Sequence, residues 1–125
     1  MDKLHVSVEQ FEKALGRFQE ALAVAPSDMA RDSAIHRFEF TLDLSWKVLK
    51  TYLEEVKGVV CKSPKECFRE AYKQGVIGYD DVWLKLVDLR NETTHTYNEA
   101  YAKEIFAELS GAVEHFKSLL GAVKR

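Results

Sequence analysis

Residues 29–57, MARDSAIHRFEFTLDLSWKVLKTYLEEVK, form the longest uninterrupted helical pattern in the chain. Because two turns of an α-helix take about seven residues, apolar side chains spaced by seven share one face and predict a stripe that packs into a core. The members of this stripe are Ile35, Leu42, Leu49 and Val56. We therefore expect one long helix that ends at Gly58, since glycine suits a left-handed C-cap.

The same segment carries a second apolar stripe. At about 100° per residue, Phe40, Leu44 and Val48 fall nearly opposite the core stripe. A helix on the outside of a monomeric bundle needs only one apolar stripe. The second stripe therefore predicts an interface with a second copy or a partner protein, and the alternative is an internal contact with a short helix at about residues 64–74.

Four shorter helical patterns precede or follow this long helix in the sequence. Ser7 with Gln10 and Ser63 with Glu66 have the spacing of capping boxes, and Asn98 is expected to cap the last helix. The patterns cover about residues 8–24, 64–74, 80–94 and 98–123. Since no segment alternates as a strand does, we predict an all-α fold: an antiparallel up-and-down four-helix bundle with an additional short helix, in one domain over residues 1–125.

Composition narrows the protein class. The chain has 125 residues, of which 46% are hydrophobic, with 18 Lys and Arg against 20 Asp and Glu. This balance argues against a strongly basic protein that coats nucleic acid and against an acidic disordered tail. The sequence shows no leader-like or membrane-spanning run, so we expect a cytoplasmic protein without membrane contact. We interpret Cys61 and Cys67 as reduced thiols, because their spacing matches no common metal motif.

Residues 90–97, RNETTHTY, concentrate polar chemistry at the end of a helix. A guanidinium such as that of Arg90 binds phosphate bidentately and offsets transition-state charge. An imidazole such as that of His95 transfers protons near neutral pH. Together they suit cleavage of RNA through its own 2′-hydroxyl, and we expect no metal and no cofactor. The alternative is a cluster that only caps a helix end.

The other histidines, His5, His36 and His115, are interpreted as surface residues, and no phosphate-loop or zinc motif is present. The charge near the polar cluster is unfavourable for RNA, because residues 80–101 contain two basic and five acidic side chains. The nearest basic side chains lie on or next to the short helix at about residues 64–74, which could line the rim of a cleft. Its cations are Lys62, Lys65, Arg69 and Lys73.

Two stretches carry a family resemblance. Residues 90–97 match the R-x4-H-x-Y pattern of the HEPN superfamily, including a polar residue directly after the arginine. Residues 31–47, RDSAIHRFEFTLDLSWK, resemble one branch of it, the nucleotidyltransferase substrate-binding proteins, which are the HEPN half of HEPN–MNT pairs. The similarity extends over about residues 5–122.

This resemblance implies a function and residue roles. Such proteins form homodimers in which the R-x4-H motifs of both subunits face one cleft, and they bind a minimal nucleotidyltransferase (MNT). Several are metal-independent ribonuclease toxins, which the partner neutralises by transferring AMP to the motif tyrosine. Carried over, Arg90 would bind phosphate, His95 would be the acid and base, Asn91 would position the substrate, and Tyr97 would be AMPylated.

The resemblance leaves two functional hypotheses. The first is a ribonuclease that acts on RNA and is the toxin of a toxin–antitoxin pair. The second is a non-catalytic subunit whose cleft holds a nucleotide or another substrate for the nucleotidyltransferase.

Overall fold

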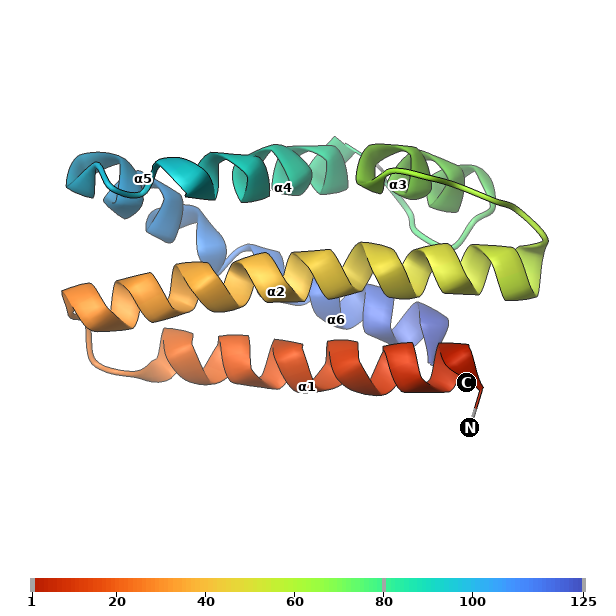
Figure 1. Cartoon of the computed structure of the whole chain (residues 1–125), viewed down its shortest axis with the longest axis horizontal. Helices are drawn as coiled ribbons and strands as arrows, with labels where there is room; N and C mark the ends of the chain where they lie inside the picture. Colours follow the sequence, from red (N-terminus) through yellow and green to blue (C-terminus); the bar gives the residue numbers. More distant parts are fainter. Residues whose placement is uncertain (1, 80, 125) are drawn as a thin grey trace.

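The structure, a computed structural model, describes residues 2–79 and 81–124, and these residues contain no β-strand. The α-helices are α1 (Lys3–Ala23), α2 (Asp28–Tyr52), α3 (Pro64–Lys73), α4 (Asp81–Glu92), α5 (Glu99–Leu109) and α6 (Ala112–Val123). A π-helical turn, Leu53–Lys57, extends α2, and a 3-10 turn, Thr93–His95, extends α4. The predicted all-α bundle is confirmed, as Figure 1 shows.

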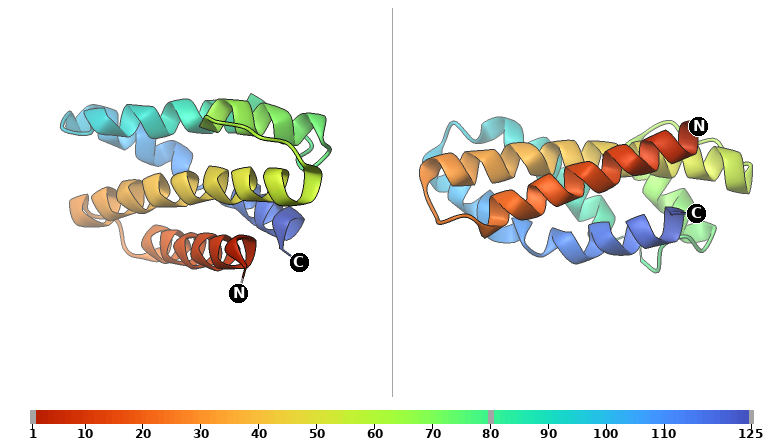
Figure 2. Two further views of the ribbon diagram at one scale, coloured as in Figure 1. Left: turned by 45° about the vertical axis from the view of Figure 1, so that its right-hand side comes forward. Right: turned by 90° about the horizontal axis from the view of Figure 1, so that it is seen from below.

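Helix α2 lies at the centre of the bundle. It runs antiparallel to α1 along one side and lies beside α4 along the other, while α5 and α6 cross behind it (Figures 1 and 2). It contacts each of the other five α-helices of the described chain. Helix α1 begins and α6 ends at the same end of the bundle (Figure 2). Residues on the remaining exposed strip of α2 therefore lie between α1 and α4.

Aromatic side chains fill the core. Phe116 of α6 packs against Phe11 and Phe18 of α1 and Phe38 of α2, with ring centroids 6.1, 6.1 and 6.2 Å away. All four rings are fully buried. The predicted core stripe of α2 is confirmed at Ile35, Leu42 and Leu49, which are buried, while Val56 is partly buried against the core. This rigid centre holds the faces of α2 in place.

Several predicted helix ends are confirmed. Gly58 adopts φ 69° after the π-helical turn, a conformation that favours glycine. The side chains of Ser63 and Asn98 accept hydrogen bonds from the backbone N–H of Glu66 (3.4 Å) and Tyr101 (3.1 Å), respectively. The local cap chemistry therefore sets where α3 and α5 begin.

Other boundaries differ from the sequence prediction. The capping box at Ser7 is wrong, because α1 starts at Lys3 and Asp2 accepts a hydrogen bond from the His5 N–H at 2.7 Å. The buried Leu4 continues the apolar stripe by one turn, which explains the longer helix. The single helix predicted for residues 98–123 divides into α5 and α6, each with its own buried face. The predicted start of the fourth helix, Asp80, lies outside the described residues.

The interpretation of the cysteines as reduced thiols is wrong. Cys61, in the loop after α2, and Cys67, in α3, form a disulfide, and both are fully buried. The turn that opens α3 folds its first residues back against the loop, so that the two Cα atoms lie 5.2 Å apart. That separation is within the range a disulfide requires. In the described parts of the chain, no helix combines the length and the apolar character needed to cross a bilayer.

Candidate functional site

Arg90 lies in the last turn of α4 and reaches α2. Its Nε donates a hydrogen bond to Oδ1 of Asp43 at 3.0 Å, and its Nη2 donates to Oδ2 at 3.1 Å. This bidentate pair is the planar geometry that guanidinium and carboxylate favour. The hydrogen bond that Arg90 donates to Asp43 raises the pKa of Arg90, against the opposing effect of burial. The arginine is therefore fixed, charged and partly exposed.

Thr93 follows α4 as the first residue of the 3-10 turn. Its hydroxyl donates a hydrogen bond to the backbone carbonyl of Arg90 at 2.6 Å. Nη1 of the same arginine donates a hydrogen bond to the hydroxyl oxygen of Thr93 at 3.4 Å. The side chain of Thr93 is buried, so it anchors the 3-10 turn that carries His95. The arginine and the histidine therefore occupy the same helix end, one in the last turn of α4 and the other in the 3-10 turn that follows.

The remaining predicted site residues face solvent. Asn91 and His95 are exposed, and Tyr97 has 86% of its surface accessible. The rings of His95 and Tyr97 meet edge to face, with centroids 6.1 Å apart. Both side chains are accessible to a large ligand.

Tyr101, in the first turn of α5, differs from Tyr97 in the hydrogen bonding of its hydroxyl. Its hydroxyl donates a hydrogen bond to Oε2 of Glu92 at 2.6 Å, and this bond raises the pKa of Tyr101 to about 12. Its phenolic proton is therefore held by a carboxylate, whereas no hydrogen bond to the Tyr97 hydroxyl is found in the described chain.

Helix α3 contacts α4 on the same side of α2 (Figure 1), and a rim role for its cations stays a prediction. Nζ of Lys65 pairs with Oδ1 of Asp88 at 2.7 Å. Asp88 precedes Arg90 by less than one turn of α4. The positive charge of Lys65 is therefore offset locally, which reduces what α3 can offer to a polyanion.

The second apolar stripe of α2 is only partly exposed. Phe40 is 53% exposed and Leu44 is partly buried, but Val48 is fully buried, so its assignment to an intermolecular interface is wrong. Val48 follows Thr41 by two turns on the same side, and the Thr41 hydroxyl donates to the carbonyl of Ala14 in α1 at 3.3 Å. Val48 therefore packs within the monomer, on the side that faces α1.

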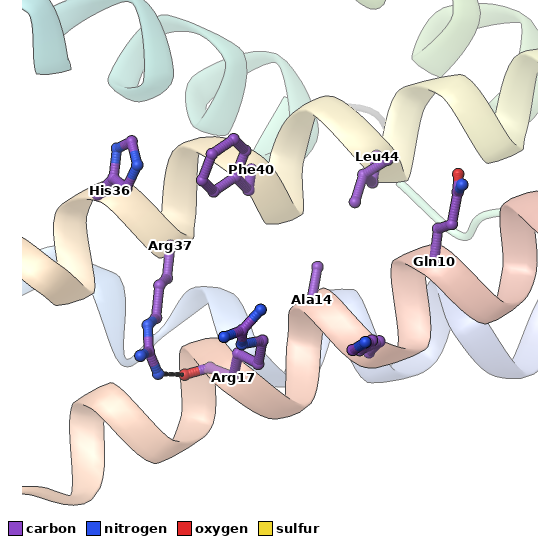
Figure 3. Close-up of a pocket in the computed structure, with 8 residues that line it drawn as sticks. Gln10, Ala14, Arg17, His36, Arg37, Phe40 and Leu44 are labelled. Carbon is purple, nitrogen blue, oxygen red and sulfur yellow. Dashed lines mark hydrogen bonds between the residues drawn. The ribbon is translucent and has the colours of Figure 1, made fainter.

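Phe40 and Leu44 line a groove of about 540 Å³ between α1 and α2. The other residues that line it are Gln10, Lys13, Ala14, Arg17, His36 and Arg37. Figure 3 shows Arg37 reaching from α2 to the backbone carbonyl of Arg17, to which its Nη1 donates at 2.7 Å. We call this feature the α1–α2 groove. The sequence reasoning missed it, although Lys13 and Arg17 stand four residues apart on α1.

Side chains that commonly bind metals are dispersed over the bundle. Within residues 2–79 and 81–124, no three His, Cys, Asp or Glu side chains converge as a metal site requires.

Comparison with known proteins shows the family to which the chain belongs. Residues 6–125 match the family model described as nucleotidyltransferase substrate binding protein like. A curated relative, the probable ribonuclease HepT of Haemophilus influenzae, is 34% identical over 80 residues, which are 61% of this chain and 55% of that protein. The match thus spans about half the length of this relative.

Solved structures give the same fold. A protein from Thermus thermophilus superimposes with a TM-score of 0.86 and 39% identity, over 92% of this chain and 99% of that one. A Haemophilus influenzae protein, described as revealing the fold of a substrate binding domain of a nucleotidyltransferase, gives a TM-score of 0.70 and 24% identity. That alignment covers 98% of this chain and 97% of the other.

Proposed function

Because the chain belongs to the nucleotidyltransferase substrate-binding protein family of the HEPN superfamily, we propose that it is the HEPN-type partner of a minimal nucleotidyltransferase and a metal-independent ribonuclease. The observation that carries this proposal is the helix end of α4, where a fixed guanidinium precedes an exposed imidazole. The similarity to a probable ribonuclease supports the same reading. In this proposal the chain is the toxin of a cytoplasmic toxin–antitoxin pair.

The proposed reaction uses the 2′-hydroxyl of RNA as the nucleophile. Its oxygen attacks the adjacent phosphorus while a base takes its proton, and the bond from phosphorus to the 5′-oxygen breaks. An acid returns a proton to that oxygen, so the products are a 2′,3′-cyclic phosphate and a 5′-hydroxyl. His95 transfers protons in this scheme, Asn91 positions the substrate, and Arg90 offsets the charge that develops on the phosphoryl oxygens.

A homodimer supplies what one chain lacks. The scheme needs a base and an acid, whereas one R-x4-H motif contains one imidazole. Two copies that face each other across one cleft would provide both. We place this interface on the motif face, because the α1–α2 groove that contains Phe40 and Leu44 carries several cations, and a two-fold axis through the groove would bring these cations close to their copies.

Tyr97 is the proposed target of the nucleotidyltransferase. Its oxygen would attack the α-phosphorus of ATP, lose its proton and release pyrophosphate, leaving AMP on the ring. The 86% exposure of Tyr97 makes it accessible to a second enzyme, whereas the Tyr101 hydroxyl is engaged by Glu92. A bulky anionic group two residues from His95 would block RNA from the cleft.

The second candidate function is a non-catalytic subunit that holds a nucleotide or substrate for the nucleotidyltransferase. One observation favours it: Asp43 accepts hydrogen bonds from two N–H groups of Arg90, which leaves fewer donors free for the charge that develops on the phosphoryl oxygens during cleavage. In that case nucleotide binding would depend on Arg90 while no RNA would be cleaved.

The ribonuclease proposal is tested with purified protein, single-stranded RNA and EDTA. We expect wild-type protein to cleave the RNA and His95→Ala to abolish cleavage, because the proton transfers are lost. His5→Ala is the matched control, since His5 is an exposed histidine that pairs with Glu9 at the start of α1. Cleavage by His95→Ala at the wild-type rate would refute the proposal.

The modification proposal is tested separately. After incubation with the partner nucleotidyltransferase and ATP, intact mass should increase by whole AMP units. Tyr97→Phe should prevent the increase, whereas Tyr79→Phe should not, although Tyr79 is 79% exposed. An unchanged increase in Tyr97→Phe would rule out Tyr97 as the target.

A further inference from the structure

We propose that the α1–α2 groove is a second RNA-binding site, which holds the strand whose scissile phosphate lies at Arg90 and His95. The proposal rests on the ribonuclease function proposed above and names a surface outside the R-x4-H motif. The groove combines positive charge with an exposed aromatic ring, which is the combination that binds single-stranded RNA without strict sequence preference.

The groove is electropositive. Lys13 and Arg17 lie one turn apart on α1, and both are exposed. Neither forms an ion pair within residues 2–79 and 81–124, in contrast to the closely paired Arg90. Arg37 faces them from α2, with Glu20 at 3.9 Å from its Nη1 as its nearest carboxylate. Two cations are thus available for phosphates, and a third is only weakly offset.

Phe40 supplies a surface on which a base can stack. It is 53% exposed, although phenylalanine side chains are commonly buried. The ring of His36 meets it edge to face, with centroids 4.6 Å apart, and so restricts its orientation. An aromatic ring that is exposed but held in place is a suitable stacking platform.

The groove and the R-x4-H motif lie on the two flanks of one helix. Asp43, which holds Arg90, directly precedes Leu44, which lines the groove. A strand that crosses the exposed strip of α2 from α4 to α1 would travel about 10 Å, the diameter of a helix. One RNA strand can therefore reach both sites.

The binding experiment uses the full-length His95→Ala protein, so that the RNA stays intact, and a fluorescein-labelled single-stranded RNA measured by anisotropy. We expect Lys13→Ala/Arg17→Ala to weaken binding about tenfold or more and to reduce the slope of log K against log salt by about 0.7 for each phosphate that is no longer neutralised. Lys103→Ala/Lys117→Ala removes the same charge from α5 and α6, outside the groove, and should change neither.

The aromatic contribution is tested without a change of charge. Phe40→Ala should weaken binding about fivefold or more, because a base can no longer stack there. Val60→Ala is the control, since Val60 is also exposed, at 62%, but lies outside the groove. Circular dichroism should show unchanged helicity for every variant.

The outcomes separate this proposal from the function on which it rests. If the groove variants bind RNA as tightly as their controls, the second site is refuted, even if His95→Ala has lost cleavage. If His95→Ala still cleaves while the groove variants bind weakly, the catalytic assignment fails and the RNA site stands. If the groove variants lose binding to a polyglutamate peptide but not to RNA, the groove is a protein-docking surface and the proposal is overturned.

Discussion

The two flanks of α2 use positive charge in opposite ways. On the α4 flank, Arg90 forms a bidentate pair with Asp43, at 3.0 and 3.1 Å. On the α1 flank, Lys13 and Arg17 are exposed and have no ion pair among the described residues. One oriented cation, on α4, therefore lies along one flank of α2, and a group of available cations, on α1, lies along the other.

This difference separates positioning from attraction. A guanidinium held by a carboxylate keeps its orientation but contributes little net charge at a distance, because the two charges offset each other. Cations without partners attract a polyanion over a longer range but do not fix its geometry. We therefore expect the α4 flank to control the chemical step and the α1 flank to control RNA binding.

The largest expected effect is on cleavage. Arg90→Ala should reduce kcat by about 100-fold or more, because it removes charge stabilisation at the transition state. Lys13→Ala/Arg17→Ala should instead raise KM and leave kcat nearly unchanged. Cleavage rates at varied RNA concentration, in the presence of EDTA, measure both quantities. Equal changes in kcat for the two variants would contradict the division between the flanks.

The next largest effect concerns stability near the α4 flank. Reduction of the disulfide between Cys61 and Cys67 should lower the free energy of unfolding by about 2 kcal/mol, because the unfolded chain loses a cross-link that closes a short loop. Urea denaturation with and without a reductant measures the difference, and Cys61→Ser/Cys67→Ser should be insensitive to the reductant. Since α3 contacts α4 but lines no part of the α1–α2 groove, RNA affinity at the groove should not change. A reductant-dependent affinity would link the two flanks.

A smaller effect is expected from Asp43→Asn. The pair is partly exposed, so its loss should lower the free energy of unfolding by about 1 kcal/mol or less. The functional effect should be larger than the stability effect, with a reduced kcat and an unchanged RNA affinity, because Arg90 loses its orientation. Asp32→Asn removes an exposed carboxylate elsewhere on the same helix and serves as the control. A kcat equal to that of wild type would show that Asp43 does not position Arg90.

The smallest effect is a pH dependence beside the motif. Because the hydrogen bond to Glu92 raises the pKa of Tyr101 from 10.0 to about 12, the protonated phenol is favoured in the folded state. Its contribution to stability should be complete below pH 10 and disappear as the pH rises toward 12. Ultraviolet titration of tyrosinate should show a late-titrating group that is absent in Tyr101→Phe. Tyr97→Phe should leave that group in place, and its loss there would assign the late titration to Tyr97.

Local patterns predicted much of the fold. The seven-residue repeat of Ile35, Leu42 and Leu49 identified the core face of α2, because helical periodicity is a property of the backbone. The caps at Ser63 and Asn98 were predicted for the same reason, since they act over three or four residues. The division between α5 and α6 was missed, although it falls at Ser110 and Gly111, two residue types that lower helix stability.

The site residues, too, could be predicted only where a local pattern identifies them. The motif itself identified Arg90, Asn91, His95 and Tyr97 as a polar group at a helix end, and the structure places all four there. The pairing of Arg90 with Asp43 joins residues 47 positions apart, and no local pattern announces it. Val48 was assigned to the wrong environment because its place on the helix could be predicted, but not which neighbour covers that side.

The sequence by itself determined the helices, the core face of α2 and the chemical groups of the motif, because helix periodicity and capping act over a few residues. Only the tertiary structure decided which cations are paired and which are available, since charges interact with whatever the fold brings near them. It also decided that Val48 belongs to the core and that Phe40 and Leu44 line a basic groove between α1 and α2.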